Sequence, residues 1–298
     1  HNKLITPYII NNNWDKYNKK DLIHILENLQ IRKTSCKTIL CNKNCSEKLN
    51  NYNILYILKY TKNQYIKEYL LKKFDSTLLP YFLPLFISYI KNDSLKDLSI
   101  TNYLINNCTS IQLLIELFFN MFIIINNIDN KNIDNKNIDN KNNNIYKHSL
   151  QLIKNSLKSK NEKKYNSIIN SIKLINLLSQ LNNNNTDKYI NSINDFIKKN
   201  EVYIPLNNEK QLKNISKNII IKDSNTKPII IEVQFVDETK KQILFKKEDV
   251  RVDYVICKII QFIKYILNDT HISTNLLTYN ILPINNSYGI IEIIENAH

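Results

Sequence analysis

The N-terminal part of the chain carries apolar residues at helical spacing. In residues 21–29 they recur every three or four positions, and Asp21 is placed to cap the first turn. Short polar breaks such as Asp75-Ser76 separate the helices that follow. These predicted helices are Asn53–Tyr60, Gln64–Phe74, Leu78–Ile90, Ile100–Asn106 and Ser110–Ile124. Short antiparallel helices in succession predict a helical-repeat stack over residues 1–126.

Residues 127–144 have no such period. Asn-Ile-Asp-Asn-Lys occurs there three times in tandem, and asparagine is unfavourable in the interiors of helices and strands. We therefore predict a disordered Asn-rich insertion. Helical spacing resumes over residues 145–200, with a break at Asn182–Asn185, which predicts a helical linker segment.

The pattern changes to that of short strands after residue 200. Runs rich in isoleucine and valine alternate with polar breaks where hairpin turns are expected. The predicted strands are Glu201–Pro205, Asn218–Lys222, Pro228–Val236, Gln242–Lys246, Leu276–Pro283 and Gly289–Ile294, with one helix over Asp249–Leu267. The fold class is therefore α followed by α+β, with a five-stranded antiparallel sheet in residues 201–298.

The formal net charge of +14 would suit a nucleic acid or an anionic membrane. Arginine occurs only twice, however, while Lys, Asn, Ile and Tyr are abundant, which matches AT-rich codons. We interpret most of the excess as a solvated lysine surface and expect no nucleic-acid partner. No stretch reaches the roughly 20 uninterrupted apolar residues of a membrane span, because Gln112, Glu116 and Asn120 interrupt residues 111–125.

A single glycine, Gly289, excludes several motifs that need more of them. These are the Walker loop, the dinucleotide fingerprint, the glycine loop of protein kinases and the elbow of serine hydrolases. Cys36, Cys41 and Cys45 have the spacing C-x4-C-x3-C with no fourth ligand nearby, so we expect reduced thiols rather than a zinc site.

One run combines a lysine with acidic residues where a predicted strand meets a predicted helix. It reads Leu-Phe-Lys-Lys-Glu-Asp-Val-Arg-Val-Asp over residues 244–253. A nucleotide kinase needs a fixed cation for the α- and β-phosphates and acidic groups that position it. The same residues also suit a charged turn before a helix whose N-terminus favours acids. On these residues alone both interpretations stay open.

Several segments, in the same order, resemble those of the phosphatidylinositol 3- and 4-kinases. Residues 244–253 resemble the family's F-K-x-G-D-D-L-R-Q-D run, and residues 223–229 its S-x-x-K-x-P phosphate turn. Residues 278–283 resemble its P-Y-x-x-L strand, and residues 289–294 its G-x-I-E-x-x hinge. The glycine of G-D-D is absent, the spacer after Lys246 is one residue shorter, and Val252 replaces a glutamine.

Three further segments are similar to the type III phosphatidylinositol 4-kinases. They are Val202–Leu206 (V-W-L-P), Tyr81–Ile87 (Y-L-P-Q-L-L) and Tyr103–Cys108 (Y-I-V-H-R-C). The resemblance implies a helical accessory domain of a lipid kinase followed by the N-lobe of its kinase domain, with the C-lobe missing.

The resemblance also implies a role for each matched residue. ATP would lie between the two lobes, with Lys246 at its phosphates and Ser224 in the phosphate turn. Asp253 would orient Lys246 or Tyr279, and Tyr279 would line the pocket. The resemblance places the remaining matches around the adenine ring. Ile291 would lie behind the ring, and the backbone of Glu292 and Ile294 would meet its edge at the hinge.

The catalytic D-R-H-x-N and the Mg²⁺-binding D-F-G segments do not occur in the chain. We therefore expect it to be part of a longer protein, with no catalytic or metal-binding residue of its own and no activity alone. Mg²⁺ would be bound through the missing C-lobe.

For the full protein the resemblance implies transfer of the ATP γ-phosphate to an inositol lipid in a membrane surface. A phosphatidylinositol 4-kinase is preferred because of Val202–Pro205 and Tyr81–Ile87. Such an enzyme is cytoplasmic and peripherally membrane-associated, at the Golgi or endosomes, with a regulatory protein on its helical domain. The alternatives are a phosphatidylinositol 3-kinase, a protein kinase of the related group, or a non-enzymatic helical-repeat scaffold with an unrelated α+β module.

Overall fold

The computed structural model describes residues 31–32, 46–47, 50–134, 140–181, 186–206, 210–224, 226–270 and 275–294. The helix predicted at residues 21–29 and the cysteines at 36, 41 and 45 lie outside these ranges. The chain forms two compact units. The first comprises residues 1–77 and 88–107, and the second residues 78–87 and 108–298.

The first unit is mostly helical, as predicted. Its helices are α3 (Asn51–Tyr60), α4 (Gln64–Lys73) and α6 (Ser99–Asn107), with the 3-10 turn η3 (Ile90–Asn92) and most of η2 (Ser76–Leu78). Two polar breaks cap helices: the side chain of Asn50 accepts from the N–H of Asn53, and that of Asn63 from the N–H of Ile66. The helical expectation is wrong for the short antiparallel pair β1 (Ile31–Arg32) and β2 (Ser46–Glu47).

A buried polar cluster ties α4 to α6 inside the first unit. The Lys67 ammonium is fully buried and pairs with Asp97 and, at 3.2 Å, with Asp93. Asp93 also accepts hydrogen bonds at 2.9 Å from both the N–H and the hydroxyl of Thr101. The cluster therefore joins one residue of α4 to the loop before α6 and to α6 itself.

The second unit begins with helices. They are α5 (Leu79–Tyr89, its last two residues in the first unit), α7 (Ile111–Asp134), α8 (Asn140–Lys160), α9 (Glu162–Leu178) and α10 (Thr186–Lys199). Since α7 to α10 belong to the same unit as the sheet, the division between units does not coincide with the boundaries expected at residues 126, 144 and 200.

The Asn-rich repeat is partly helical, unlike the disordered insertion that the sequence predicts. α7 continues to Asp134 and α8 begins at Asn140, while residues 135–139 lie outside the described part of the chain. Once a packed helix exists, adding a residue costs little, and asparagine lowers helix stability by less than about 1 kcal/mol per residue. The helices therefore extend past their buried segments.

The sheet confirms the predicted antiparallel arrangement of five strands. They are β3 (Leu212–Ile221), β4 (Ile229–Phe235), β5 (Lys240–Lys246), β6 (Ile281–Pro283) and β7 (Gly289–Glu292), in the order β3-β4-β5-β7-β6. Every neighbouring pair is antiparallel. The helical layout followed by this sheet is the succession that the sequence predicts.

Several strand boundaries differ from the prediction, and β6, for example, begins at Ile281 rather than at Leu276. β3 begins at Leu212 rather than Asn218, and it contains register shifts that break its alternation of polar and apolar residues. The segment predicted as a strand at Glu201–Pro205 forms only one isolated bridge, between Tyr203 and Gln211. The Asn194 side chain of α10 accepts a hydrogen bond from the N–H of Ile215 at 2.8 Å and donates one to its C=O at 2.9 Å. These two bonds hold α10 on β3.

Helix α11 (Arg251–Asp269) lies between β5 and β6 in the chain and packs close to the sheet. A Cβ atom at Gly289 would lie 2.0 Å from a methyl carbon of Val250, the residue before the helix. The only glycine of the chain therefore stands where the start of α11 approaches β7 most closely.

One described helix, α7, has a segment long and apolar enough to cross a membrane by length and composition. More than half of that segment is buried within the fold, however. Its Glu116 carboxylate is buried and lies 2.8 Å from the ammonium of Lys258 and 3.3 Å from the hydroxyl of Tyr254, both in α11. α7 thus acts as a core helix that holds α11.

Candidate functional site

Lys246 is the last residue of β5 and pairs with Gly289 of β7. Its side chain is partly buried, and its ammonium forms an ion pair with Glu248, two residues on. A lysine fixed by a neighbouring acid at the end of a strand is suited to meet an anionic ligand. The structure therefore places the Lys246 ammonium at the end of strand β5, and its acidic partner is Glu248 rather than the predicted Asp253.

Ser224 lies in the exposed connection between β3 and β4. Ile221 pairs with Ile229, which pairs with Phe245, so this connection and Lys246 lie at the same end of the sheet. The Ser224 N–H donates to the carbonyl of Lys222 at 3.1 Å. A phosphate at this turn would therefore meet the Ser224 hydroxyl rather than its N–H.

Asp253 of α11 and Tyr279, which precedes β6, lie in one environment. Tyr279 packs against a cluster of Val250, Tyr254, Cys257 and Ile281. A hydrogen bond with Cys257 raises the pKa of Tyr279, as do burial and the charge of Asp253. Tyr279 is one of the two partners that the resemblance implies for Asp253, and the charge of Asp253 contributes to the raised pKa of Tyr279.

Ile291 of β7 faces the same side of the sheet as Lys246. Leu244 pairs with Ile291 and Lys246 with Gly289, and side chains alternate along each strand, so Lys246 and Ile291 point to one face. Ile291 is partly buried against the cluster that contains Cys257 and Ile281. The sheet therefore joins a cation and an apolar wall beneath α11.

Glu292 pairs with Ile243, which places its side chain on the opposite face of the sheet. Its carboxylate lies 2.7 Å from Lys241 and accepts from the Asn280 amide at 2.9 Å. Its N–H donates to the Asn280 carbonyl at 2.9 Å. The side chain thus fastens β5, β6 and β7 together, which leaves only the backbone beyond β7, including the half-buried Ile294, for a ligand.

Sequence reasoning missed three neighbours of these residues: Glu248 beside Lys246, Cys257 beside Tyr279, and Asn280 beside Glu292. Alternation along an extended chain would have indicated Glu248, because residues two apart point to the same side. Cys257 and Asn280 depend on how α11 and β6 pack against the sheet, and no local pattern indicates that.

The described residues fit a nucleotide only in part. Lys246 and the Ser224 turn supply a cation and a hydroxyl at one end of the sheet, but Glu248 competes with a phosphate for Lys246. Among the described residues, no group of three His, Cys, Asp or Glu side chains could hold a metal ion. What this part of the chain offers is therefore a cation, a hydroxyl group and an apolar surface.

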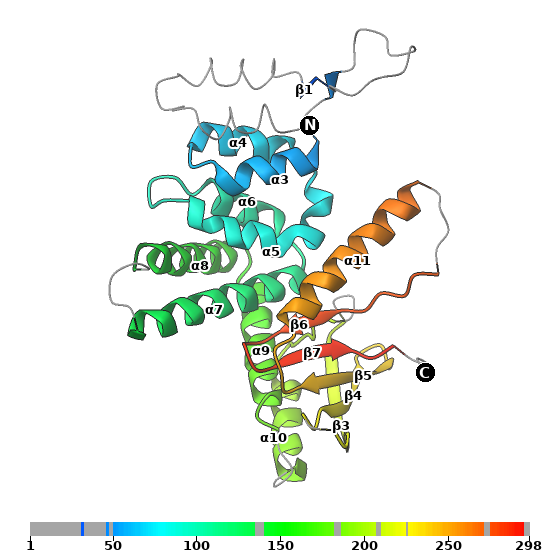
Figure 1. Cartoon of the computed structure of the whole chain (residues 1–298). Helices are drawn as coiled ribbons and strands as arrows, with labels where there is room; N and C mark the ends of the chain where they lie inside the picture. The colour runs from blue at the N-terminus through cyan, green and yellow to red at the C-terminus, as the bar shows by residue number, and fades with distance from the viewer. Residues whose placement is uncertain are drawn as a thin grey trace. The chain divides into compact units, whose positions relative to one another are not determined.

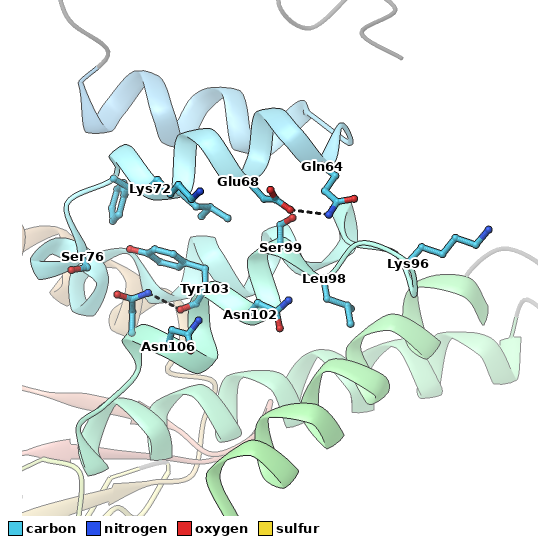
Figure 2. A pocket seen from close by; sticks show the side chains of 13 residues that line it. Gln64, Glu68, Lys72, Ser76, Lys96, Leu98, Ser99, Asn102, Tyr103 and Asn106 are labelled. Atoms are coloured by element: carbon cyan, nitrogen blue, oxygen red, sulfur yellow. Dashed lines mark hydrogen bonds between the residues drawn. The ribbon is translucent and has the colours of Figure 1, made fainter. Parts of the chain in front are cut away.

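A separate cleft of about 640 Å³ lies in the first unit between α4 and α6. Figure 2 shows Gln64, Glu68 and Lys72 extending from α4, with Ser99, Asn102 and Asn106 on α6 opposite them. Glu68 accepts a hydrogen bond from Gln64 at 2.8 Å. None of the sequence-predicted site residues lines this cleft, and its mixed amides and charges form no arrangement of nucleophile and base.

No protein-family model and no curated protein matches this chain.

Proposed function

We propose that residues 201–298 form the ATP-binding N-lobe of a phosphatidylinositol kinase, with a 4-kinase preferred over a 3-kinase. The observation that carries the proposal is the position of Lys246. It ends the third strand of the sheet, a helix follows it directly, and the β6–β7 hairpin returns beside it. Kinases place the lysine that binds the ATP phosphates on the third strand of such a sheet, next to a helix.

In this proposal Lys246 binds the phosphates and the Ser224 hydroxyl supports them from the neighbouring turn. Glu248 holds the lysine in place until a phosphate replaces it. Ile291 and Tyr279 form the apolar side of the adenine site, and Asp253 orients Tyr279. The backbone of Glu292 and Ile294 would then meet the adenine edge.

ATP supplies the phosphoryl group, and the segments that bind Mg²⁺ and catalyse the transfer lie in a C-lobe that this chain lacks. The acceptor in our proposal is an inositol lipid at a membrane surface, so the full protein would be cytoplasmic and peripherally membrane-associated. A regulatory protein would bind the helical domain.

Photolabelling with an azido derivative of ATP tests the nucleotide site in this chain. We expect label in the peptide that contains residues 289–294, competition by excess ATP, and loss of label in Lys246→Met but not in Lys247→Met. Label in the peptides that line the cleft between α4 and α6, or label that persists in Lys246→Met, would contradict the proposal.

A second experiment addresses the reaction. The full-length protein should phosphorylate phosphatidylinositol vesicles, and chromatography of the deacylated product should identify the 4-phosphate. A 3-phosphate product would favour a phosphatidylinositol 3-kinase, transfer only to protein would favour the related protein kinases, and no transfer at all would favour the scaffold.

A further inference from the structure

Helix α11, which is orange in Figure 1, exposes a stripe of aliphatic side chains. The five residues of this stripe, which we call the α11 seam, are between 42% and 68% exposed. They are Val252, Ile256, Ile259, Ile263 and Ile266. An apolar patch of this kind, on the order of 500 Å², is comparable to the largest patch of a typical monomer, and such patches are often functional.

The other side of α11 packs against the fold. Tyr254, Cys257 and Lys258 are buried there, and Phe262 packs against Phe82 of α5, with 4.7 Å between the ring centroids. A surface helix normally turns its apolar side inward and its charged side outward. Because α11 carries aliphatic side chains on its outward side as well, the α11 seam is a candidate interaction surface.

The spacing of the α11 seam identifies the shape of its partner. Its residues follow one another at intervals of four, three, four and three, the spacing of the contact positions between two packed helices. The seam runs for about 21 Å along the helix axis, or roughly four turns. A second helix with the same spacing fits this surface.

A membrane surface suits the seam less well. Helices that lie in a membrane interface carry lysines and arginines along their polar face. On α11, Arg251 is paired with Asp249 at 2.6 Å and Lys258 is buried against Glu116. Only Lys264 remains beside the seam as a basic side chain of this helix.

We propose that a second copy of this chain covers the α11 seam, as an antiparallel pair of α11 helices. The seam is complementary to itself, since it consists of similar aliphatic residues that lie almost evenly on both sides of its central Ile259. Asp253 and Lys264 lie eleven residues apart, about three turns, and so flank the seam on the same side. Antiparallel pairing brings each Asp253 near a Lys264 of the other copy, because flanking positions on the same side of two antiparallel helices face each other. In a parallel pair these two positions do not meet.

The size of the contact sets the expected affinity. Two seams would bury about 1,000 Å² in total, at the lower limit of specific interfaces, which corresponds to a dimer with a Kd of roughly micromolar order. The proposal does not depend on the nucleotide site.

Sedimentation velocity across micromolar concentrations of the 298-residue chain tests the proposal. We expect a mass that rises towards twice 35.3 kDa, and a Kd raised at least tenfold by Ile259→Lys at the centre of the seam. The matched control is Val236→Lys, an equally exposed valine at the β4–β5 turn, which should leave the dimer intact. Circular dichroism should show both variants folded.

Disulfide formation tests the orientation, in a background where the natural cysteines are serines. Ile259→Cys should cross-link with itself, while Val252→Cys should cross-link with Ile266→Cys and not with itself. Each of three outcomes would overturn the proposal. They are a wild-type chain that stays monomeric, a dimer Kd that Ile259→Lys leaves unchanged, and a monomer that binds anionic phosphatidylserine vesicles through the seam.

Discussion

At the end of β5, two adjacent lysines differ in their surroundings. Lys246 belongs to the strand and is paired with Glu248, whereas Lys247 follows the strand and is exposed. Neighbouring residues of an extended chain point in opposite directions. Only one of the two lysines can therefore serve the nucleotide site.

Lys246→Met should lower phosphoryl transfer by about 10²-fold or more in the full-length protein, because it removes a charge from the transferring group. Lys247→Met should change the rate little, since an exposed charge contributes little. The assay is transfer to phosphatidylinositol, with folding checked separately. Equal activity of both variants would refute the role of Lys246, and loss only at Lys247 would mean that the assignment is off by one residue.

The contact between Gly289 and Val250 gives a second prediction at the residue scale. Gly289→Ala should destabilise the protein by about 1–3 kcal/mol, because the new methyl group would meet Val250 at 2.0 Å. The measurement is the free energy of unfolding in urea. The double variant Gly289→Ala/Val250→Ala should recover part of the loss relative to the sum of the single variants, and strictly additive effects would rule out this contact as the cause.

At the scale of elements, buried charges connect helices that are far apart in sequence. Lys67 of α4 holds the loop before α6, and Glu116 of α7 holds Lys258 and Tyr254 of α11. Burial is the main cause of the raised pKa of Asp93, which the charge of Lys67 partly offsets, and burial also raises the pKa of Tyr254. Removing the ammonium of Lys67 or of Lys258 leaves buried carboxylates without their counter-charge.

Lys67→Met should therefore lower the free energy of unfolding by about 3–5 kcal/mol, which is the usual effect of removing one partner of a buried ion pair. Lys72→Met, on the exposed side of the same helix, is the matched control and should cost less than about 0.5 kcal/mol. Thermal unfolding followed by circular dichroism compares the two. Similar losses in both variants would show that the cluster does not stabilise α4 and α6.

At the scale of the whole molecule, the Asn-rich repeat joins α7 and α8 inside one unit. Asp129 and Lys147 form an exposed ion pair at 3.0 Å beside it, which contributes little on its own. The repeat itself has no apolar period that could pack against the rest of the unit.

Replacing residues 130–143 with a Gly-Ser linker of equal length should therefore leave the melting temperature almost unchanged. The control is the same replacement over residues 145–158, which removes the buried Ile145, Tyr146 and Leu150 and should be strongly destabilising. Differential scanning calorimetry measures both. A large loss on replacing the repeat would mean that its residues pack against the fold.

Local pattern in the sequence determined the class and order of the elements. Helical spacing predicted α3 to α6 and the start of α7 closely, because each helix buries one stripe of apolar side chains. A run of isoleucine and valine predicted β4, a short extended run predicted β5, and helical spacing of apolar residues predicted α11. The class and order of the elements depend on residues within a few positions of one another, and these can be read directly from the sequence.

Only the tertiary structure decided which residues meet. The strand order β3-β4-β5-β7-β6 places Lys246 opposite Gly289 and Lys241 beside Glu292, and the packing of α11 places Cys257 beside Tyr279. It also buries Lys258 and exposes Ile259 on the same helix. Such pairs depend on register and on the packing of residues far apart in the chain, such as Glu116 and Lys258, which are 142 positions apart. Local sequence pattern cannot specify them, because any helix or strand can bury its face against several partners.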